Sequence, residues 1–142
     1  MATGATSIPK PLPRVSEELA PFFAAARRRQ LVVQRCDDCG TLRFPARELC
    51  AGCLSRRASW VPVSGRGRVL SFYVMHQVYH PAFAAEVPYA VVVVELDEGP
   101  RLTTSLVACG PAEIRIDMPV EVTFEDRSDQ VSLPVFRPAA AR

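Results

Sequence analysis

Two Cys-x-x-Cys pairs, ten residues apart, are the feature that most limits how this chain can fold. They place Cys36, Cys39, Cys50 and Cys53 within the stretch CDDCGTLRFPARELCAGC. Each pair is just long enough for both sulfurs to reach one ion, and two such knuckles on a short hairpin supply the four tetrahedral ligands of a zinc site. Because four sulfurs leave no open coordination position, we expect a structural Zn²⁺ rather than a catalytic one.

Other interpretations of the four cysteines fit less well. Disulfides conflict with the expected compartment, because the N-terminus MATGATSIPKPLPR lacks an apolar signal-peptide core and the longest aliphatic run, AVVVV, is far shorter than the roughly 20 residues of a membrane span. We therefore expect a cytoplasmic protein with reduced thiols. A thioredoxin-type motif needs only one pair. Iron bound by the same thiolates, as in rubredoxin, stays open as the less favoured metal.

The chain divides into five expected segments: an extended arm (1–15), an amphipathic helix (16–30), a zinc ribbon (31–60), an OB-fold (61–137) and a tail (138–142). Alternate prolines from Pro9 to Pro13 favour the extended arm. The helix is predicted from apolar residues at i, i+3, i+4 and i+7, namely Leu19, Phe22, Phe23 and Ala26. Within it, Pro21 is tolerable only in the first turn.

Five β-strands are expected after Trp60, at residues 67–80, 88–96, 101–109, 118–126 and 130–137. The tight-turn signature DEGP joins the second strand to the third, and GPAEIRID, which is long enough for a helical turn, joins the third to the fourth. This order is that of a five-stranded Greek-key barrel, the OB-fold, whereas an immunoglobulin-like sandwich needs about seven strands. The predicted fold class is therefore mainly β.

The other chemistry-bearing residues predict no catalytic site. His76 and His80 would lie about 13 Å apart on one extended strand, too far to share an ion, so we expect packing or surface roles. Cys109 ends an apolar stretch, where a buried inert thiol is the default. Without a nucleophile and base pair, the chain lacks the parts of a stand-alone hydrolase or transferase.

The order of these motifs resembles the "domain of unknown function thirty-five" family from about Phe22 to Arg137. The resemblance is carried by LVVQRCDDCGTLRFPARELCAGC, WVPVSGRGRVLSFYVMHQ, PYAVVVVELDEGPRLTTSLVACGP and IRIDMPVEVTFED. The family usually has a glycine where this chain has Arg29 and Gln30, and often a tryptophan where Phe23 stands.

That resemblance implies a rubredoxin-like zinc ribbon followed by an OB-fold. It also implies a non-catalytic accessory subunit in a hetero-oligomer with an acyl-CoA enzyme of the thiolase superfamily: a thiolase, a hydroxymethylglutaryl-CoA synthase or an aldolase of steroid side-chain degradation. The catalytic residues then belong to the partner. The small subunit helps to hold the acyl-CoA thioester, as a ligand shared with the partner, and stabilises the partner enzyme.

Charge and surface residues bear on this function. Seven arginines could meet the phosphates of coenzyme A, and the sequence does not choose among them: Arg27, Arg28, Arg29, Arg43, Arg47, Arg56 and Arg57. The loop VYHPAF (78–83) and the apolar helix face suit a partner interface. The alternative is a module that binds single-stranded nucleic acid, as other OB-folds do. Against this alternative, the expected OB-fold half is net acidic, because residues 61–142 hold seven Lys/Arg and ten Asp/Glu, whereas a nucleic-acid-binding surface is usually basic.

Overall fold

The computed structural model describes residues 7–140, so residues 1–6 of the expected arm and 141–142 of the expected tail lie outside the described residues. The helical elements are α1 (Ala20–Arg27) and the short 3-10 helices η1 (Pro81–Phe83) and η2 (Pro111–Glu113). The strands are β1 (Val32–Cys36), β2 (Leu42–Arg43), β3 (Ala58–Pro62), β4 (Arg66–Met75), β5 (Tyr89–Leu96), β6 (Arg101–Ser105), β7 (Pro119–Asp126) and β8 (Ser132–Pro138).

Helix α1 is shorter than the predicted range of 16–30. It starts at Ala20, with Pro21 in its first turn, because proline has no N–H to donate and would disrupt a helix that began earlier. It ends before Arg29, whose φ of +60° leaves the helical region. The predicted apolar face is confirmed, since Phe22 and Phe23 are buried. The suggestion that this face forms a partner interface is wrong, because it packs into the chain's own core.

The ribbon is a three-stranded antiparallel sheet in the order β2-β1-β3. Its central strand, β1, pairs Gln34 with Arg43 on one side and with Trp60 on the other. The cysteine knuckles lie in the turns that follow β1 and precede β3. A short sheet of this kind has little core of its own, so its packing against neighbouring elements matters for stability.

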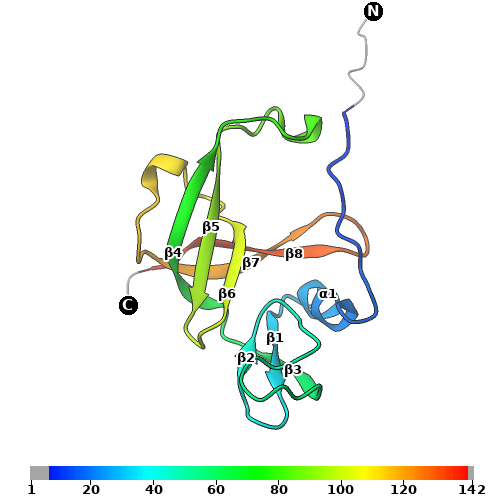
Figure 1. Cartoon of the computed structure of the whole chain (residues 1–142). Helices are drawn as coiled ribbons and strands as arrows, with labels where there is room; N and C mark the ends of the chain where they lie inside the picture. Colours follow the sequence, from blue (N-terminus) through cyan, green and yellow to red (C-terminus); the bar gives the residue numbers. More distant parts are fainter. Residues whose placement is uncertain (1–6, 141–142) are drawn as a thin grey trace, which may run out of the picture.

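The second half is a nearly closed barrel with the strand order β6-β5-β4-β7-β8, which confirms the predicted OB-fold (Figure 1). The edge strands β6 and β8 approach each other through a parallel bridge between Leu106 and Phe136. The hydrogen bond from Val107 N to Phe136 O, 2.8 Å long, lies at the same place. The predicted hairpin between β5 and β6 and the helical turn before β7 are also present.

Two predicted strands end earlier than expected. The first was predicted to reach residue 80, but β4 ends at Met75, where its partner residue in the hairpin is Tyr89. Beyond this pair the chain leaves the ladder, since residues 76–88 form the connection that carries η1. The third was predicted to reach residue 109, but β6 ends at Ser105 and the chain then turns across to β8.

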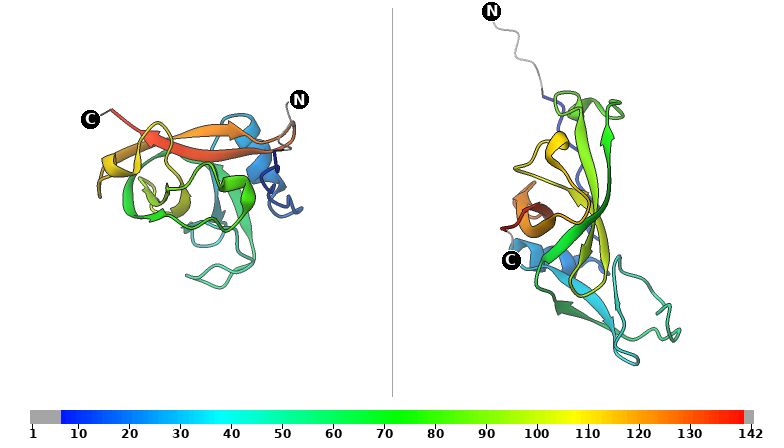
Figure 2. Two further views of the ribbon diagram at one scale, coloured as in Figure 1. Left: turned by 90° about the horizontal axis from the view of Figure 1, so that it is seen from above. Right: turned by 90° about the vertical axis from the view of Figure 1, so that its left-hand side faces the viewer.

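One hydrophobic core joins the helix, the ribbon and the barrel. Phe22 joins α1 to the ribbon, because its ring centroid is 5.5 Å from that of Phe44 and 6.1 Å from that of Trp60, and both of these residues lie in the ribbon. Val33 of β1 and Phe136 of β8 are fully buried in the same cluster. In Figure 2 the ribbon continues directly from the lower end of the barrel. Within residues 7–140, no helix is long and apolar enough to span a membrane.

Candidate functional site

The four paired cysteines come together at the end of the ribbon. Their sulfur atoms all lie within 4.8 Å of one another, and within residues 7–140 they form the single cluster of His, Cys, Asp and Glu that could hold a metal ion. The Sγ atoms of Cys36 and Cys53 are 3.5 Å apart, as are those of Cys39 and Cys50. Tetrahedral zinc with Zn–S bonds of about 2.3 Å places sulfurs about 3.8 Å apart, so the donor set fits one ion.

The two knuckles repeat one pattern of backbone hydrogen bonds. Gly40 N donates to Cys36 O, and Leu54 N donates to Cys50 O, both at 2.9 Å. The residue after each pair has a positive φ, which is +76° at Gly40 and +62° at Leu54. The second knuckle therefore uses a leucine in a backbone conformation that favours glycine. Sequence analysis did not predict that Leu54 would be equivalent to Gly40. The signal that could have indicated it is that each of the two residues directly follows the second cysteine of its pair.

Backbone N–H groups favour the thiolate form of two of the cysteines. Hydrogen bonds from the N–H groups of Cys53 and Gly52 lower the pKa of Cys50 to about 6. The N–H of Cys39 lowers the pKa of Cys36 in the same way. The N–H of Ser55 does not offset the neighbouring cysteine sulfurs at Cys53, which raise the pKa of that thiol to about 12. Because thiolates, not thiols, bind metal, the first cysteine of each knuckle is prepared for a cation, and Cys53 would lose its proton as the ion binds.

The chain between the knuckles is fixed by the buried side chain of Gln34. Its Oε1 accepts hydrogen bonds from Arg43 Nε at 2.9 Å and from Arg47 N at 3.0 Å. The Arg43 guanidinium also donates to Arg47 O at 2.9 Å. A paired buried amide of this kind holds the hairpin in one conformation, since an unpaired amide would be costly to bury.

Several of the seven candidate arginines are already engaged. Arg29 pairs with Asp126, Arg56 with Glu48 and Arg57 with Asp38. Arg43 is bonded to Gln34 and to a backbone carbonyl, as described above. Of the seven, the three whose side chains make no hydrogen bond or ion pair within residues 7–140 are Arg27, Arg28 and Arg47.

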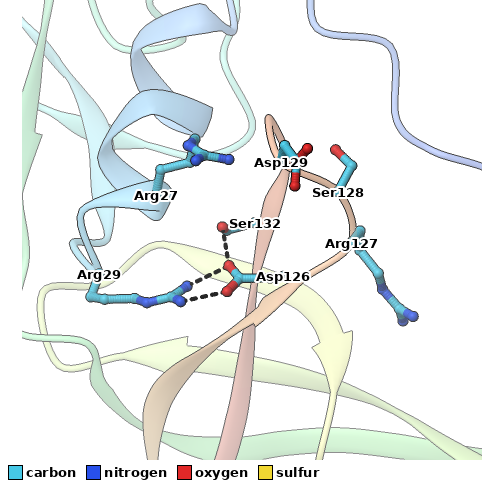
Figure 3. A pocket seen from close by; sticks show the side chains of 7 residues that line it. All are labelled: Arg27, Arg29, Asp126, Arg127, Ser128, Asp129 and Ser132. Atoms are coloured by element: carbon cyan, nitrogen blue, oxygen red, sulfur yellow. Dashed lines mark hydrogen bonds and ion pairs between the residues drawn. The ribbon is translucent and has the colours of Figure 1, made fainter.

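Arg27 lines an open pocket of about 370 Å³ at the end of α1, shown in Figure 3. At its base Arg29 donates to both carboxylate oxygens of Asp126, at 2.8 and 2.7 Å, and Ser132 Oγ donates to one of them. These bonds, that of Arg29 first, hold the pKa of Asp126 well below its usual range. Sequence analysis missed this pair because 97 residues separate its members.

The two histidines and Cys109 do not join the cysteine cluster. His76 is exposed beyond the end of β4, and His80 caps η1, where its Nδ1 accepts from Ala82 N at 3.1 Å. Neither lies on a strand, so the predicted strand placement of both is wrong. Cys109 is half-buried in the loop before η2 rather than at the end of a strand, and burial raises its pKa.

The predicted interface loop, residues 78–83, protrudes at the end of the hairpin formed by β4 and β5, away from the zinc ribbon (Figure 1). Val78 and Tyr79 are exposed there, with 72% of the Tyr79 surface accessible. The loop is attached to the N-terminal segment through Lys10, which pairs with Glu86 and lies 5.2 Å from the ring centroid of Phe83. The exposed apolar side chains are thus held on an anchored loop.

Comparisons with known proteins find two family models in tandem. Residues 23–58 match the ChsH2 rubredoxin-like zinc ribbon domain, and residues 60–125 match the ChsH2 C-terminal OB-fold domain. A solved structure named Ltp2-ChsH2(DUF35) aldolase is 44% identical, with a TM-score of 0.81, and the match covers 91% of this chain and 100% of that one.

Three curated relatives show the range of the similarity. A probable enoyl-CoA hydratase alpha subunit of Thermomonospora curvata is 45% identical over 92% of this chain, which spans 40% of that relative's length. A DUF35 domain-containing scaffold protein of Methanocaldococcus jannaschii is 38% identical, over 71% of this chain and 74% of the relative. The benzoylsuccinyl-CoA thiolase subunit BbsA of Thauera aromatica is 31% identical, over 78% of this chain and 76% of the relative.

Proposed function

This chain belongs to the DUF35 family, and from that premise we propose that it is an accessory subunit of an acyl-CoA-processing enzyme of the thiolase superfamily. The observation that carries the proposal is the match, at 44% identity, to the whole DUF35 chain of a structure named as an aldolase. Relatives named as a hydratase alpha subunit and a thiolase subunit support the same class of partner. A cytoplasmic location goes with this proposal.

We further propose that Cys36, Cys39, Cys50 and Cys53 bind one structural Zn²⁺. The support is the sulfur spacing and the N–H groups directed at the thiolates. Bound zinc would crosslink the two knuckles and supply folding free energy to a ribbon that has only three short strands. The four cysteines would occupy every position of a tetrahedral ion, so their role is to fix the ribbon's shape.

The ligand shared with the partner is proposed to be the acyl-CoA. Its phosphates need cationic side chains that are not already neutralised, and guanidinium groups suit phosphate oxygens. Arg27, which lines the open pocket at the end of α1, and its chain neighbour Arg28 meet this need, since neither makes an ion pair within residues 7–140. In the same part of the chain Arg29 is held by Asp126.

The proposed function is tested by purifying the tagged protein from its native cells and identifying what accompanies it by mass spectrometry. A thiolase-like or aldolase-like enzyme in stoichiometric amount is the expected result. The absorbance spectrum of the same preparation reports nucleic acid. Recovery of nucleic acid without any acyl-CoA enzyme would overturn the proposal and favour a strand-binding module.

The arginine assignment has its own test. In the purified complex, replacing Arg27 and Arg28 together by Gln should weaken the binding of coenzyme A about tenfold in isothermal titration, because two charge-assisted contacts are lost. Arg35→Gln is the matched control, since Arg35 is an exposed arginine on β1 with no ion pair within residues 7–140. Equal affinity of the double variant and this control would contradict the assignment.

A further inference from the structure

Strand β4 has an edge that no other strand covers. It is ten residues long, but it pairs with β7 only through Arg66, Gly67 and Arg68. Asp117 N donates to Val69 O, and Val69 N donates to Met118 O. Beyond these bonds, within residues 7–140, the backbone of residues 71–75 pairs with β5 alone. Figure 2, right, looks onto this side of the molecule, where β4 crosses in front of β5 and the loop that carries η2 lies beside it.

The register shows which backbone groups are free at this edge. Leu96 N donates to Pro100 O at 2.9 Å, and Val94 lies opposite Leu102, so the even-numbered residues of β5 direct their N–H and C=O groups toward β6. Val74 of β4 lies opposite Ala90, which is even-numbered and therefore directs its own N–H and C=O groups toward β6. Val74 and Ala90 are thus a pair that does not share hydrogen bonds. The N–H and C=O groups of Val74 therefore point away from β5, toward the open side.

This edge lacks the protection that the other edges have. Between residues 69 and 79 there is no Lys, Arg, Asp, Glu or Pro, and these are the residues that natural sheets place on free edges to prevent pairing. The edges of β6 and β8 close on each other at the Leu106–Phe136 bridge. In the ribbon, β2 is only two residues long and β3 ends in Pro62.

Exposed apolar side chains lie along the same edge. Tyr73 on β4 and Ile116 in the adjoining loop are each 54% exposed, and Val78 and Tyr79 continue the surface beyond the strand. Unpaired backbone groups flanked by apolar side chains are the features of a site that accepts an added strand, in which main-chain hydrogen bonds give affinity and side chains give specificity.

We propose that the outer edge of β4 receives an extended, uncharged segment of the catalytic partner subunit, which adds to the sheet beside residues 71–75. This inference rests on the proposed function. The absence of charge along the edge matches an uncharged strand, because a charged one would lose hydration with no ion pair in return. A catalytic partner is favoured as the occupant because relatives are named as subunits of a thiolase and of an aldolase complex, and because the edge is continuous with the exposed loop at Tyr79.

The test uses the acyl-CoA enzyme that co-purifies with the chain. Val74→Pro removes an outward N–H and places a ring on the edge, and Tyr73→Lys adds a charge there. Each should weaken the binding of the enzyme at least tenfold by biolayer interferometry. Thr103→Lys, at an exposed position of β6, is the matched control and should bind as the wild type does. Zinc content and the melting temperature of each variant establish that it is folded.

Hydrogen exchange of the unaltered complex gives an independent readout. The outward amide of Val74 should exchange rapidly in the free chain and become protected when the enzyme binds. Wild-type affinity of Val74→Pro, with no protection at Val74, would overturn the inference and leave the proposed function intact. A dimer of the free chain that Val74→Pro dissociates, with enzyme binding unchanged, would assign the edge to a second copy and also overturn it. If no acyl-CoA enzyme co-purifies, both proposals fail.

Discussion

Arg29 shows how one residue can take over the position of a glycine. It follows α1 in a left-handed conformation, with φ +60°, and the next residue, Gln30, donates back to Ala25 O at 3.0 Å. The family resemblance expects a glycine at this point of the chain, where a helix end of this type commonly requires one. Arginine keeps the same backbone path, and its bidentate pair with Asp126 offsets the strain by joining the helix end to the barrel.

The strain and the ion pair at Arg29 can be separated by two substitutions. Arg29→Gly and Arg29→Ala both remove the pair, but only alanine keeps a Cβ in the left-handed region. We expect the alanine variant to melt about 2–4 °C below the glycine variant, the shift that corresponds to roughly 1 kcal/mol in a chain of this size. Thermal unfolding followed by circular dichroism makes the comparison. Equal melting temperatures would show that the backbone at this position is not strained.

The depressed pKa of Asp126 predicts a pH dependence of stability. A carboxyl whose pKa is lower in the folded state contributes stability above its unfolded pKa of about 3.9, and that contribution is lost as the pH falls through the folded value. Asp126→Asn should therefore melt below the wild type at pH 7, and the gap should narrow below about pH 4. Asp129→Asn is the control, because Asp129 is exposed nearby and makes no ion pair within residues 7–140. A gap independent of pH would contradict this role for Asp126.

At the scale of elements, the ribbon depends on its two equivalent knuckles. Cys50→Ser should release the metal and lower the melting temperature, because binding free energy in small zinc sites is also folding free energy. The wild type treated with a strong chelator should behave in the same way. Cys109→Ser is the matched control and should keep one equivalent of zinc by mass spectrometry of the metal. A Cys50→Ser protein with full zinc content and unchanged melting would disprove the metal site.

How far the sequence predicts these elements depends on how local their causes are. The cysteine spacing and the DEGP turn act over a few residues, and accordingly the four sulfurs lie together and the turn joins β5 to β6. The end of the first barrel strand depends instead on its partner strand, since β4 pairs only as far as Met75, opposite the first residue of β5, Tyr89. The residues Val78, Tyr79 and His80 extend the strand prediction to residue 80, because valine and tyrosine favour strands, but residues 76–88 form the connection between β4 and β5. No local pattern indicated that Arg29 would meet Asp126.

At the scale of the whole molecule, the shared core predicts one unfolding transition. Phe22 contacts ribbon side chains and belongs to the core cluster that extends into the barrel. Fluorescence of Trp60, the single tryptophan, reports the ribbon, and far-ultraviolet circular dichroism mainly reports the barrel strands. We expect both signals to change at the same denaturant concentration, because cooperative cores unfold together.

A variant at the centre of that core tests the same coupling. Phe22→Ala should destabilise the chain by about 3–5 kcal/mol and move both signals together. Leu12→Ala, at a position that is 53% exposed, should leave both within about 0.5 kcal/mol of the wild type. Two separate transitions in either protein would show that ribbon and barrel are independent units.

The core that runs through helix, ribbon and barrel also decides how this chain can be recombined by genetic fusion. The family boundary near residue 60 is a boundary in sequence only, since it falls within β3 of the ribbon, and Trp60 of that strand packs against the core cluster that includes Phe136 of the barrel. Dividing the gene there would give two fragments, each of which would expose apolar core side chains to solvent and tend to aggregate. The unit that can be transplanted into a longer polypeptide is therefore the whole assembly of helix, ribbon and barrel.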